Sequence, residues 1–580
     1  MRIVSRLGVM FSLVSLAFAG GPKISSDLRM LDPESTVDVI IQYKHAPTAA
    51  HHQKIADKGG SLNSQLDAVK GGQYRVPVNK LAEIEADDDV AYVSKDRAVH
   101  GSATAVYDYT PQTVGAFALG SNFGAGVGVA VIDSGISANA DFNNPTTKKT
   151  RIVYKESFLS GVSDASDYFG HGTHLAGIVA GNGASSAGST YSHQIRGIAG
   201  GANLINLRVL DANGNSTDSI VIQAIQKAIS LKSTYNIRVI NLSLGRPVFE
   251  SYTLDPLCQA VESAWKAGIV VVVAAGNSGR DSSANTSGYA TVTAPGNDPL
   301  AITVGAMKTV STAAPSDDLI ASYSSKGPTL LDHLVKPDLV APGNLIFSVL
   351  DPVGSLKTSY PGNVPPVSTY EKSPYLNPNS NYFVLSGTSM SAAVVSGASA
   401  AMIAQDGTLT PDQVKARLMK TASKAFPATS QVTVYDANNI PTTYVSQYDL
   451  FTVGAGYVNV AAAMANTDRL TAGQTAQSPE AHYDSATGNV TVVSGTSAVW
   501  GTSAVWGTSA VWGTSAVWGT SVFLGGSSAV WGTSAVWGTS AVWGTNTNTG
   551  FSAVWGTSAV WGTSTVAGPE STGIAINGEN

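Results

Sequence analysis

Three polar residues that lie far apart in the chain have the side chains needed for nucleophilic catalysis. Asp133 ends an apolar, strand-like run, His171 stands where a helix should begin, and Ser389 would occupy the first turn of a helix built of small residues. An imidazole can take the proton of a serine hydroxyl, and a carboxylate can orient the imidazole. Taken singly, Asp133 also fits a turn or a helix cap, and Ser389 also fits a helix N-cap. Only the three together predict an Asp-His-Ser catalytic group.

Asn277 adds a second chemical element. It lies in the glycine-rich run at 274–279, directly after an apolar, strand-like run. Its side-chain amide could donate a hydrogen bond to a developing oxyanion, together with backbone N–H groups that lack helical partners in the first turn of the Ser389 helix. Considered alone, Asn277 is equally well a turn residue.

A metal site is the competing interpretation of His171, because His174 follows it by three positions. The sequence has no His-Glu-x-x-His motif, and no cluster of Cys and His lies nearby. Zinc peptidases need such a ligand set. We therefore expect no catalytic metal at this point of the chain, and we expect His174 to have a packing role.

The composition limits the classes of partner and of stabilising bond. A net charge of −6 and a pI near 5.8 exclude the basic patch of a nucleic-acid-binding protein. The single cysteine, Cys258, excludes an internal disulfide. Because Cys258 falls in a helical pattern beside apolar residues, we expect it to be a small buried hydrophobe and not a nucleophile.

The elements that must position these residues lie between residues 125 and 466. Short apolar, β-branched runs alternate there with helical patterns, which predicts an α/β fold with a doubly wound parallel sheet and helices on both faces. The predicted strands are 127–133, 205–210, 239–244, 269–275 and 301–305, and the predicted helices are 173–181, 217–231, 256–267 and 389–404. Such sheets bind ligands beyond the carboxyl ends of their strands, where Asp133 and Asn277 both stand.

Residues 1–19 are typical of a secretory signal peptide. Two arginines precede a mainly apolar stretch, which ends in the small-x-small sequence Ala17-Phe18-Ala19. The stretch is too short to span a bilayer, and no later apolar run reaches that length. The sequence therefore predicts a secreted, extracellular protein without a transmembrane segment.

The region between the signal and the large unit predicts a small α+β domain. Strand patterns alternate with helical patterns from residue 36 to residue 100. The predicted strands are 37–43, 72–78 and 90–94, and the predicted helices are 51–69 and 79–86.

Several independent segments of the large unit resemble the subtilase family of serine proteases. The order Asp, His, Ser is that of subtilisin and differs from the orders of chymotrypsin and the α/β-hydrolases. The segments that carry the resemblance are VAVIDSGI at 129–136, HGTHLAGIVAG at 171–181, INLSLG at 240–245, VVAAGNSG at 272–279, KPDLVAPG at 336–343 and SGTSMSAA at 386–393. The resemblance covers about residues 125–466.

This resemblance implies a serine endopeptidase that cleaves polypeptide substrates through an acyl-enzyme. Asp133, His171 and Ser389 fall on the triad positions, and Asn277 falls on the oxyanion position. The implied substrate-binding residues are Ser243, Leu244 and Gly245, on the segment that pairs with an extended substrate, and Ala274, Ala275 and Gly276, on a wall of the pocket for the residue before the scissile bond.

The resemblance also implies a self-processing zymogen. Residues 20–105 look like the family's inhibitory propeptide, which assists folding and is then removed by a cut between Ser94 and Tyr109; an independent small binding domain is the alternative. The implied division is a signal peptide at 1–19, this propeptide, a peptidase domain at 106–466 and a C-terminal extension at 467–580.

Many subtilases bind calcium, and Asp141 lies close to one family ligand position, but no Asp-x-Asp-x-Asp-Gly loop identifies a full ligand set.

A hexapeptide repeat dominates the C-terminal extension. Ser-Ala-Val-Trp-Gly-Thr occurs nine times between residues 497 and 563, and it holds nine of the ten tryptophans. The even period keeps the tryptophans on one side of a strand, whereas a helix would spread them around its axis. We therefore predict a β-prone tail, and three roles stay open: self-association or surface attachment, a low-complexity tail without specific function, and glycan binding by exposed tryptophans.

Overall fold

The computed structural model divides the chain between Thr104 and Ala105 into two compact units, which are described separately below. The described residues are 23–25, 28–29, 31–96, 108–120, 122–281, 286–372, 380–427, 429–435, 441–470, 474–484, 489–493, 522–523, 530–531, 535–536, 576 and 578–579. The predicted signal peptide lies outside these residues, as do the stretch at 97–107 and most of the repeat.

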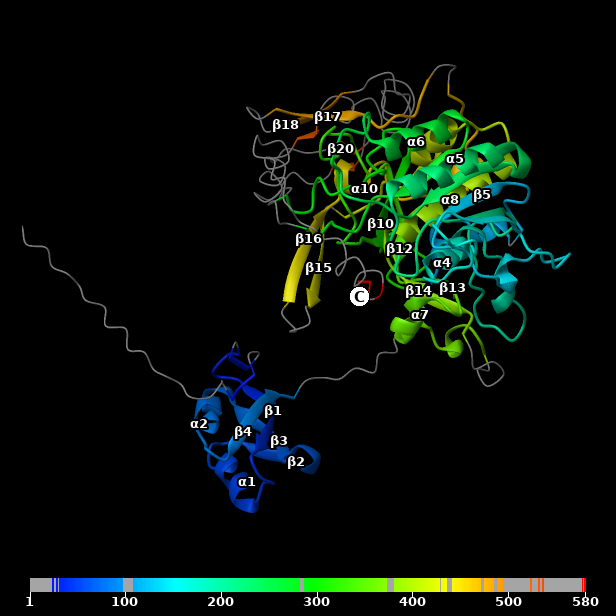
Figure 1. Ribbon diagram of the computed structural model, residues 1–580. Coiled ribbons are helices and arrows are strands. Elements are labelled where there is room, and N and C mark those ends of the chain that lie inside the picture. Colours follow the sequence, from blue (N-terminus) through cyan, green and yellow to red (C-terminus); the bar gives the residue numbers. More distant parts are fainter. Residues whose placement is uncertain are drawn as a thin grey trace, which may run out of the picture. The chain divides into compact units, whose positions relative to one another are not determined.

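The first unit is a four-stranded antiparallel sheet, in the order β2-β3-β1-β4, with two short helices (Figure 1). Every second residue of β1 is buried, so one face of this sheet forms the core of the unit. The elements are β1 (Thr36–Tyr43), α1 (Ala49–Ala56), β2 (Ser61–Leu66), β3 (Gly71–Pro77), α2 (Leu81–Glu85) and β4 (Val90–Lys95).

The predicted helix at 51–69 is wrong in its second half. The helix ends at Ala56, and Gly59 then takes a positive φ of 79° that no helix continues. Ser61–Leu66 instead pairs antiparallel with β3 as an edge strand. The side chains of this strand are exposed or half-buried, so its extended conformation depends on backbone pairing with β3 and not on side-chain burial.

The second unit is built on an eight-stranded sheet. Its strands run in the order β11-β10-β9-β8-β5-β7-β6, with β12 pairing with β10, and all pairs except β10–β11 are parallel. The strands are β5 (Gly128–Asp133), β6 (Ile152–Ser157), β7 (Asn203–Arg208), β8 (Ile237–Leu242), β9 (Val270–Ala274), β10 (Ile302–Lys308), β11 (Leu319–Ile320) and β12 (Leu339–Asn344). The five predicted strands are confirmed, with boundaries shifted by up to three residues.

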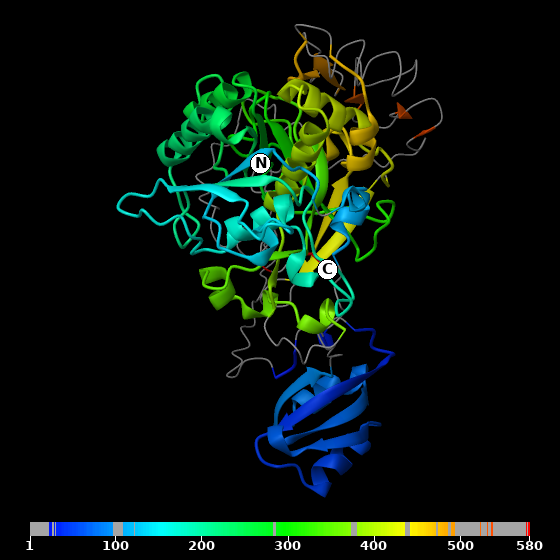
Figure 2. The ribbon, with the colours of Figure 1, turned by 90° about the vertical axis from the view of Figure 1, so that its right-hand side faces the viewer.

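Helices cover both faces of this sheet, as the sequence predicts. Figure 2 shows the green helices α5 and α6 on one side of the strands and the yellow-green helix α8 on the other. Helix α4 packs against α8, and all six residues of β5 are buried. The helices are α3 (Thr110–Thr113), α4 (His171–Ala180), α5 (Asp218–Tyr235), α6 (Pro256–Lys266), α7 (Ser355–Ser359), α8 (Thr388–Gln405), α9 (Pro411–Thr421), α10 (Leu450–Val453) and α11 (Val460–Ala465).

The remaining strands form small antiparallel pairs. β13 (Ile346–Val349) pairs with β14 (Tyr382–Leu385), and β15 (Thr429–Tyr435) pairs with β16 (Pro441–Gln447). β17 (Glu480–Asp484) pairs with β18 (Asn489–Val493), which also pairs with β19 (Val522–Phe523). Within the repeat, β20 (Val530–Trp531) pairs with β21 (Ala535–Val536); the roles considered for the repeat stay predictions.

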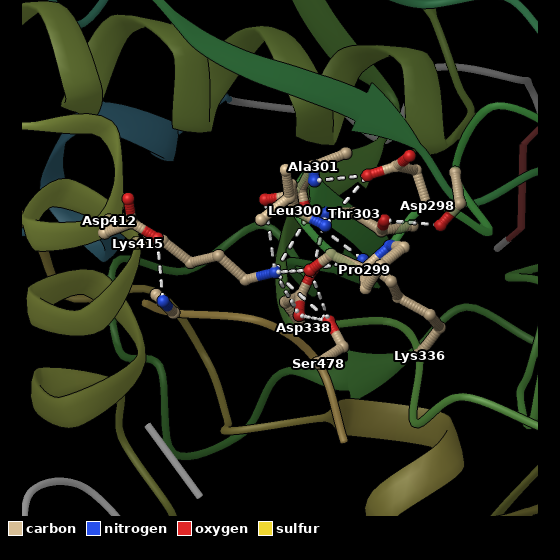
Figure 3. A network of polar contacts seen from close by, with 12 residues as sticks. Asp298, Pro299, Leu300, Ala301, Thr303, Lys336, Asp338, Asp412, Lys415 and Ser478 are labelled. Atoms are coloured by element: carbon tan, nitrogen blue, oxygen red, sulfur yellow. Dashed lines mark hydrogen bonds and ion pairs between the residues drawn. The ribbon is translucent and has the colours of Figure 1, made fainter. Parts of the chain in front are cut away.

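Residues beyond Asn466 belong to the packing of the second unit. The hydroxyl of Ser478 donates to Oδ1 of Asp338 at 2.6 Å, inside a buried polar network (Figure 3). Both Lys336 and Lys415 also donate to Asp338, at 2.8 and 3.0 Å. All three charged side chains are fully buried, so Ser478 completes a network at the centre of the domain and not a surface contact.

None of the described helices is both long and apolar enough to cross a lipid bilayer.

Candidate active site

Asp133 and His171 meet at the carboxyl edge of the large sheet. Asp133 ends β5 and His171 begins α4, and Nδ1 of His171 lies 2.8 Å from Oδ1 of Asp133. The same carboxylate oxygen accepts the backbone N–H of Ser134 at 2.8 Å. The Asp133 side chain is fully buried and the His171 side chain is 13% exposed, so the carboxylate is fixed while the imidazole can still reach a substrate.

The pKa of His171 lies above its ordinary value. Burial of the imidazole lowers this pKa, but the charge of Asp133 and the hydrogen bond to it raise the pKa by more, and Asp167 acts in the same direction. The imidazolium form is therefore stabilised at this site. A histidine of this kind can accept a proton during a reaction and hold it until a leaving group takes it.

Ser389 lies in the first turn of α8 and is tied to the segment after β8. Its hydroxyl donates to the carbonyl O of Ser243 at 3.2 Å, and the Ser243 hydroxyl donates to the carbonyl O of Ser389 at 2.9 Å. Among the described contacts, no hydrogen bond joins Ser389 to His171. Such bonds often form only when a substrate is bound.

The side chain of Asn277 is held in one orientation beside Ser389. Its Oδ1 atom accepts both the backbone N–H and the hydroxyl of Thr388, at 2.9 and 3.0 Å. Because the carbonyl oxygen has these two donors, the Nδ2 group must point the other way. The structure thus brings an amide donor next to the first turn of α8, which carries the backbone N–H of Ser389.

The two segments expected to bind substrate lie at the ends of neighbouring strands. Ser243, Leu244 and Gly245 follow β8, and Ala274, Ala275 and Gly276 end or follow β9, which is paired with β8. Among these six residues, Leu244, Gly245 and Gly276 are exposed or half-buried and the others are buried, so both segments present surface at this edge.

Thr293 connects these two segments, and the sequence did not single it out. A Cβ placed on Gly245 would lie 2.6 Å from Oγ1 of Thr293, and one placed on Gly276 would lie 3.0 Å from its Cγ2. The backbone N–H of Thr293 donates to the carbonyl O of Ala275 at 3.1 Å. The Thr293 side chain therefore fills the space between the two segments. Thr293 belongs to no sequence motif. Only the path of the loop after residue 288 places it between the two segments.

Asp167 is a second residue that the sequence analysis missed. One of its carboxylate oxygens accepts the backbone N–H of Gly170 at 2.7 Å, and the other accepts that of Thr173 at 2.8 Å. These bonds satisfy unpaired donors at the start of α4 and so fix the helix turn that carries His171. An acidic residue just before a predicted helix start is a signal that could have identified it.

The expectations for His174 and Cys258 are confirmed. His174 is fully buried, and its Nε2 lies 3.0 Å from the carbonyl O of Ile346; burial lowers its pKa to about 3, so it stays neutral. Cys258 is fully buried in α6, and burial raises the pKa of its thiol.

The residues around Asp141 do not fit a calcium ion. One oxygen of its carboxylate accepts the backbone N–H of Ser185 at 2.6 Å, and the other accepts the hydroxyl of Tyr382 at 3.1 Å. The guanidinium of Arg151 donates to the Asp141 carbonyl O at 2.8 Å, so a cationic side chain already lies beside this residue. In the described part of the chain, no group of three or more His, Cys, Asp or Glu side chains could hold a metal ion.

Comparison with known proteins agrees with this architecture. The model of the subtilase family matches residues 124–456, which is more than half of the chain. The chain therefore belongs to the subtilase family. Membership of this family makes it a serine-type endopeptidase.

Two sequence relatives support the same assignment. The chain is 39% identical to serine protease AprX of Bacillus subtilis (strain 168) over 306 residues, which are 52% of this chain and 62% of that protein. It is 32% identical to subtilisin E of the same organism over 392 residues, which are 66% of this chain and 84% of that protein. A solved cold-adapted subtilisin-like serine proteinase is similar at 28% identity and a TM-score of 0.37, over 52% of this chain and 85% of that one.

Proposed function

We propose that Ser389, His171 and Asp133 hydrolyse peptide bonds through an acyl-enzyme. The observation that carries the proposal is the 2.8 Å contact between His171 Nδ1 and Asp133 Oδ1. This hydrogen bond holds the proton on Nδ1 and leaves Nε2 as the basic nitrogen. A base so oriented, on the same edge of the sheet as a serine at a helix start, is the arrangement that nucleophilic catalysis needs.

The reaction proceeds in two balanced steps. Ser389 Oγ attacks the carbonyl carbon of the substrate while its proton passes to Nε2 of His171, and the collapsing intermediate takes that proton onto the leaving amine. Water then attacks the acyl-enzyme by the same route and releases the new carboxyl end. Asp133 keeps its negative charge throughout and stabilises the imidazolium.

Asn277 and the backbone N–H of Ser389 stabilise the oxyanion that forms in each step. The orientation imposed by Thr388 on the Asn277 amide supports this role, because the Nδ2 group needs no rearrangement when the charge appears. An extended substrate would pair with residues 243–245. The side chain before the scissile bond would enter between Gly245 and Gly276, where Thr293 limits the depth.

We also propose that the enzyme is secreted as a zymogen. Residues 1–19 would be the signal peptide, 20–105 an inhibitory propeptide, 106–466 the peptidase domain and 467–580 an extension whose first part packs into that domain. The separate core of the first unit supports a propeptide that folds by itself.

Replacement of Ser389 by alanine tests the proposal. The S389A chain should show no peptidase activity and should keep residues 20–105, as measured by intact mass and by N-terminal sequencing. Ser230→Ala, on the exposed face of α5, is the matched control and should mature normally. Normal maturation of purified S389A would contradict both self-cleavage and the assignment of the nucleophile.

A further inference from the structure

The last described residues of the chain lie against the peptidase domain. Ile576 and Glu579 are buried, and the red end of the chain lies near β14 (Figure 1). The Glu579 side chain is fully buried although it carries a carboxylate and stands next to the final residue. A buried carboxylate needs partners, so its surroundings are those of a binding site.

A polar pocket receives the Glu579 carboxylate. Its Oε1 atom accepts Nη2 of Arg280 at 2.6 Å and the backbone N–H of Ser322 at 2.8 Å, and the Ser322 hydroxyl also donates to it. Nζ of Lys308 lies 3.9 Å from Oε2. Two cations and a backbone amide thus converge on one side chain, which is the donor set of a carboxylate-binding pocket.

The peptidase domain also binds the backbone of Ile576 and Glu579. The side-chain amide of Asn344 accepts the N–H of Glu579 and donates to its carbonyl O, both at 2.7 Å. Asn363 donates to the carbonyl O of Ile576 at 2.6 Å. Gly578 has a φ of 58°, and a Cβ there would lie 2.5 Å from Oγ of Ser386. Residue 578 is therefore in close contact with the peptidase domain.

The pocket needs an anion to be stable. The side chains of Arg280 and Lys308 are only 8 and 9% exposed, so both cations have lost most of their hydration. Within the described structure, Glu579 is the only carboxylate paired with Arg280. Removing one partner of a buried ion pair leaves an uncompensated charge and is strongly destabilising.

The pocket adjoins the two segments that carry the proposed oxyanion donors. Arg280 follows Asn277 by three positions, and Ser386 precedes Ser389 by three. The segment around Glu579 therefore lies beside the catalytic edge of the sheet, although it is far in sequence from the residues of that edge.

We propose that the pocket of Arg280, Lys308, Ser322 and Asn344 binds the acidic C-terminal end of the chain as an intramolecular latch. Before the repeat, Glu480 of β17 bridges to Leu334 of the peptidase domain, and beyond the repeat the latch binds the chain to the same domain. Both ends of the Trp repeat are then held by the enzyme. A cut inside the extension would not release the repeat's C-terminal fragment, because the fragment stays bound through Glu579.

A nicked full-length chain tests the latch. A recognition sequence for a site-specific protease is inserted between Gly568 and Pro569 of the S389A chain, which cannot cut itself, and is cleaved after purification. The C-terminal fragment should elute with the main body in gel filtration. Glu579→Gln should raise the dissociation constant of the fragment by about 30-fold or more, the usual effect of truncating a buried charge pair at an interface.

Two further variants make the outcome decisive. Glu570→Gln changes the net charge of the same fragment equally and should leave it bound. Gly578→Val keeps the carboxylate but should release the fragment, because its side chain would collide with Ser386. Loss of the unmodified fragment on nicking, or equal retention of the Glu579→Gln fragment, would overturn the proposal; unchanged far-UV circular dichroism of the main body excludes unfolding as the cause.

Discussion

Nδ1 of His171 lies 2.8 Å from Oδ1 of Asp133, where the end of β5 meets the start of α4. This contact joins two residues that are 38 positions apart, and it selects the imidazole nitrogen that faces the substrate. Its consequences for rate and for pH dependence can be separated by experiment.

Asp133→Asn should lower kcat by about 10⁴-fold, because the amide favours the wrong tautomer of His171 while keeping the shape of the site. KM for a short peptide should change little. Steady-state kinetics on a chromogenic peptide measures both constants. Asp211→Asn, at a half-buried turn residue, serves as the control and should be fully active; a loss below ten-fold in D133N would mean that Asp133 does not orient the base.

The activity should rise with pH through a midpoint above the ordinary histidine value of about 6.5. Burial alone would lower the pKa of His171, but Asp133 raises it by more, and only the neutral imidazole can act as the base. Activity is therefore lost as the pH falls through this pKa. In D133N the midpoint should move to lower pH. A wild-type midpoint of kcat/KM below 6 would contradict the pairing.

Asn277→Ala should lower kcat by about 10²- to 10³-fold with little change in KM, which is the effect measured for an oxyanion-hole asparagine in subtilisin. The amide acts on charge that exists only in the transition state, so ground-state binding is spared. Because Asn277 also accepts two bonds from Thr388, the thermal midpoint must be measured in parallel. A rise in KM at constant kcat would assign Asn277 to substrate binding instead.

Thr293→Ser should broaden the pocket for the residue before the scissile bond. The change removes the methyl group nearest Gly276 and keeps the hydroxyl. The ratio of kcat/KM for a large over a small side chain at that position should rise by about 10-fold, as expected for one methyl-sized space. Thr329→Ser, at a buried threonine elsewhere in the domain, controls for loss of packing. An unchanged ratio would place the pocket elsewhere.

Ser478→Ala should destabilise the S389A chain by about 1.5–3 kcal/mol, because it removes a hydrogen bond to the buried Asp338 carboxylate. For the same reason, truncation after Asn466 should lower the thermal midpoint much more than truncation after Val493. Denaturant and thermal unfolding measure these differences. Equal midpoints for the two truncations would mean that residues 467–493 are not part of the stable domain.

The sequence by itself determined the α/β class, the order of the central elements and the residues that could do chemistry. Buried parallel strands and their helices have strong local patterns, so β5, β8, β9 and α8 were predictable. The helix predicted at 51–69 failed because pairing with β3, a non-local interaction, decides the conformation of residues 61–66.

Only the tertiary structure decided which distant residues meet. Asp167 and Thr293 lie in loops without a motif, and their roles follow from the strand order and loop paths that bring them to the start of α4 and to the edge of β8 and β9. The place of Glu579 had no local signal at all, since an acidic residue near a chain end is ordinarily solvated. Local patterns encode burial and periodicity, whereas charge pairs such as Arg280 and Glu579 depend on contacts across 299 positions.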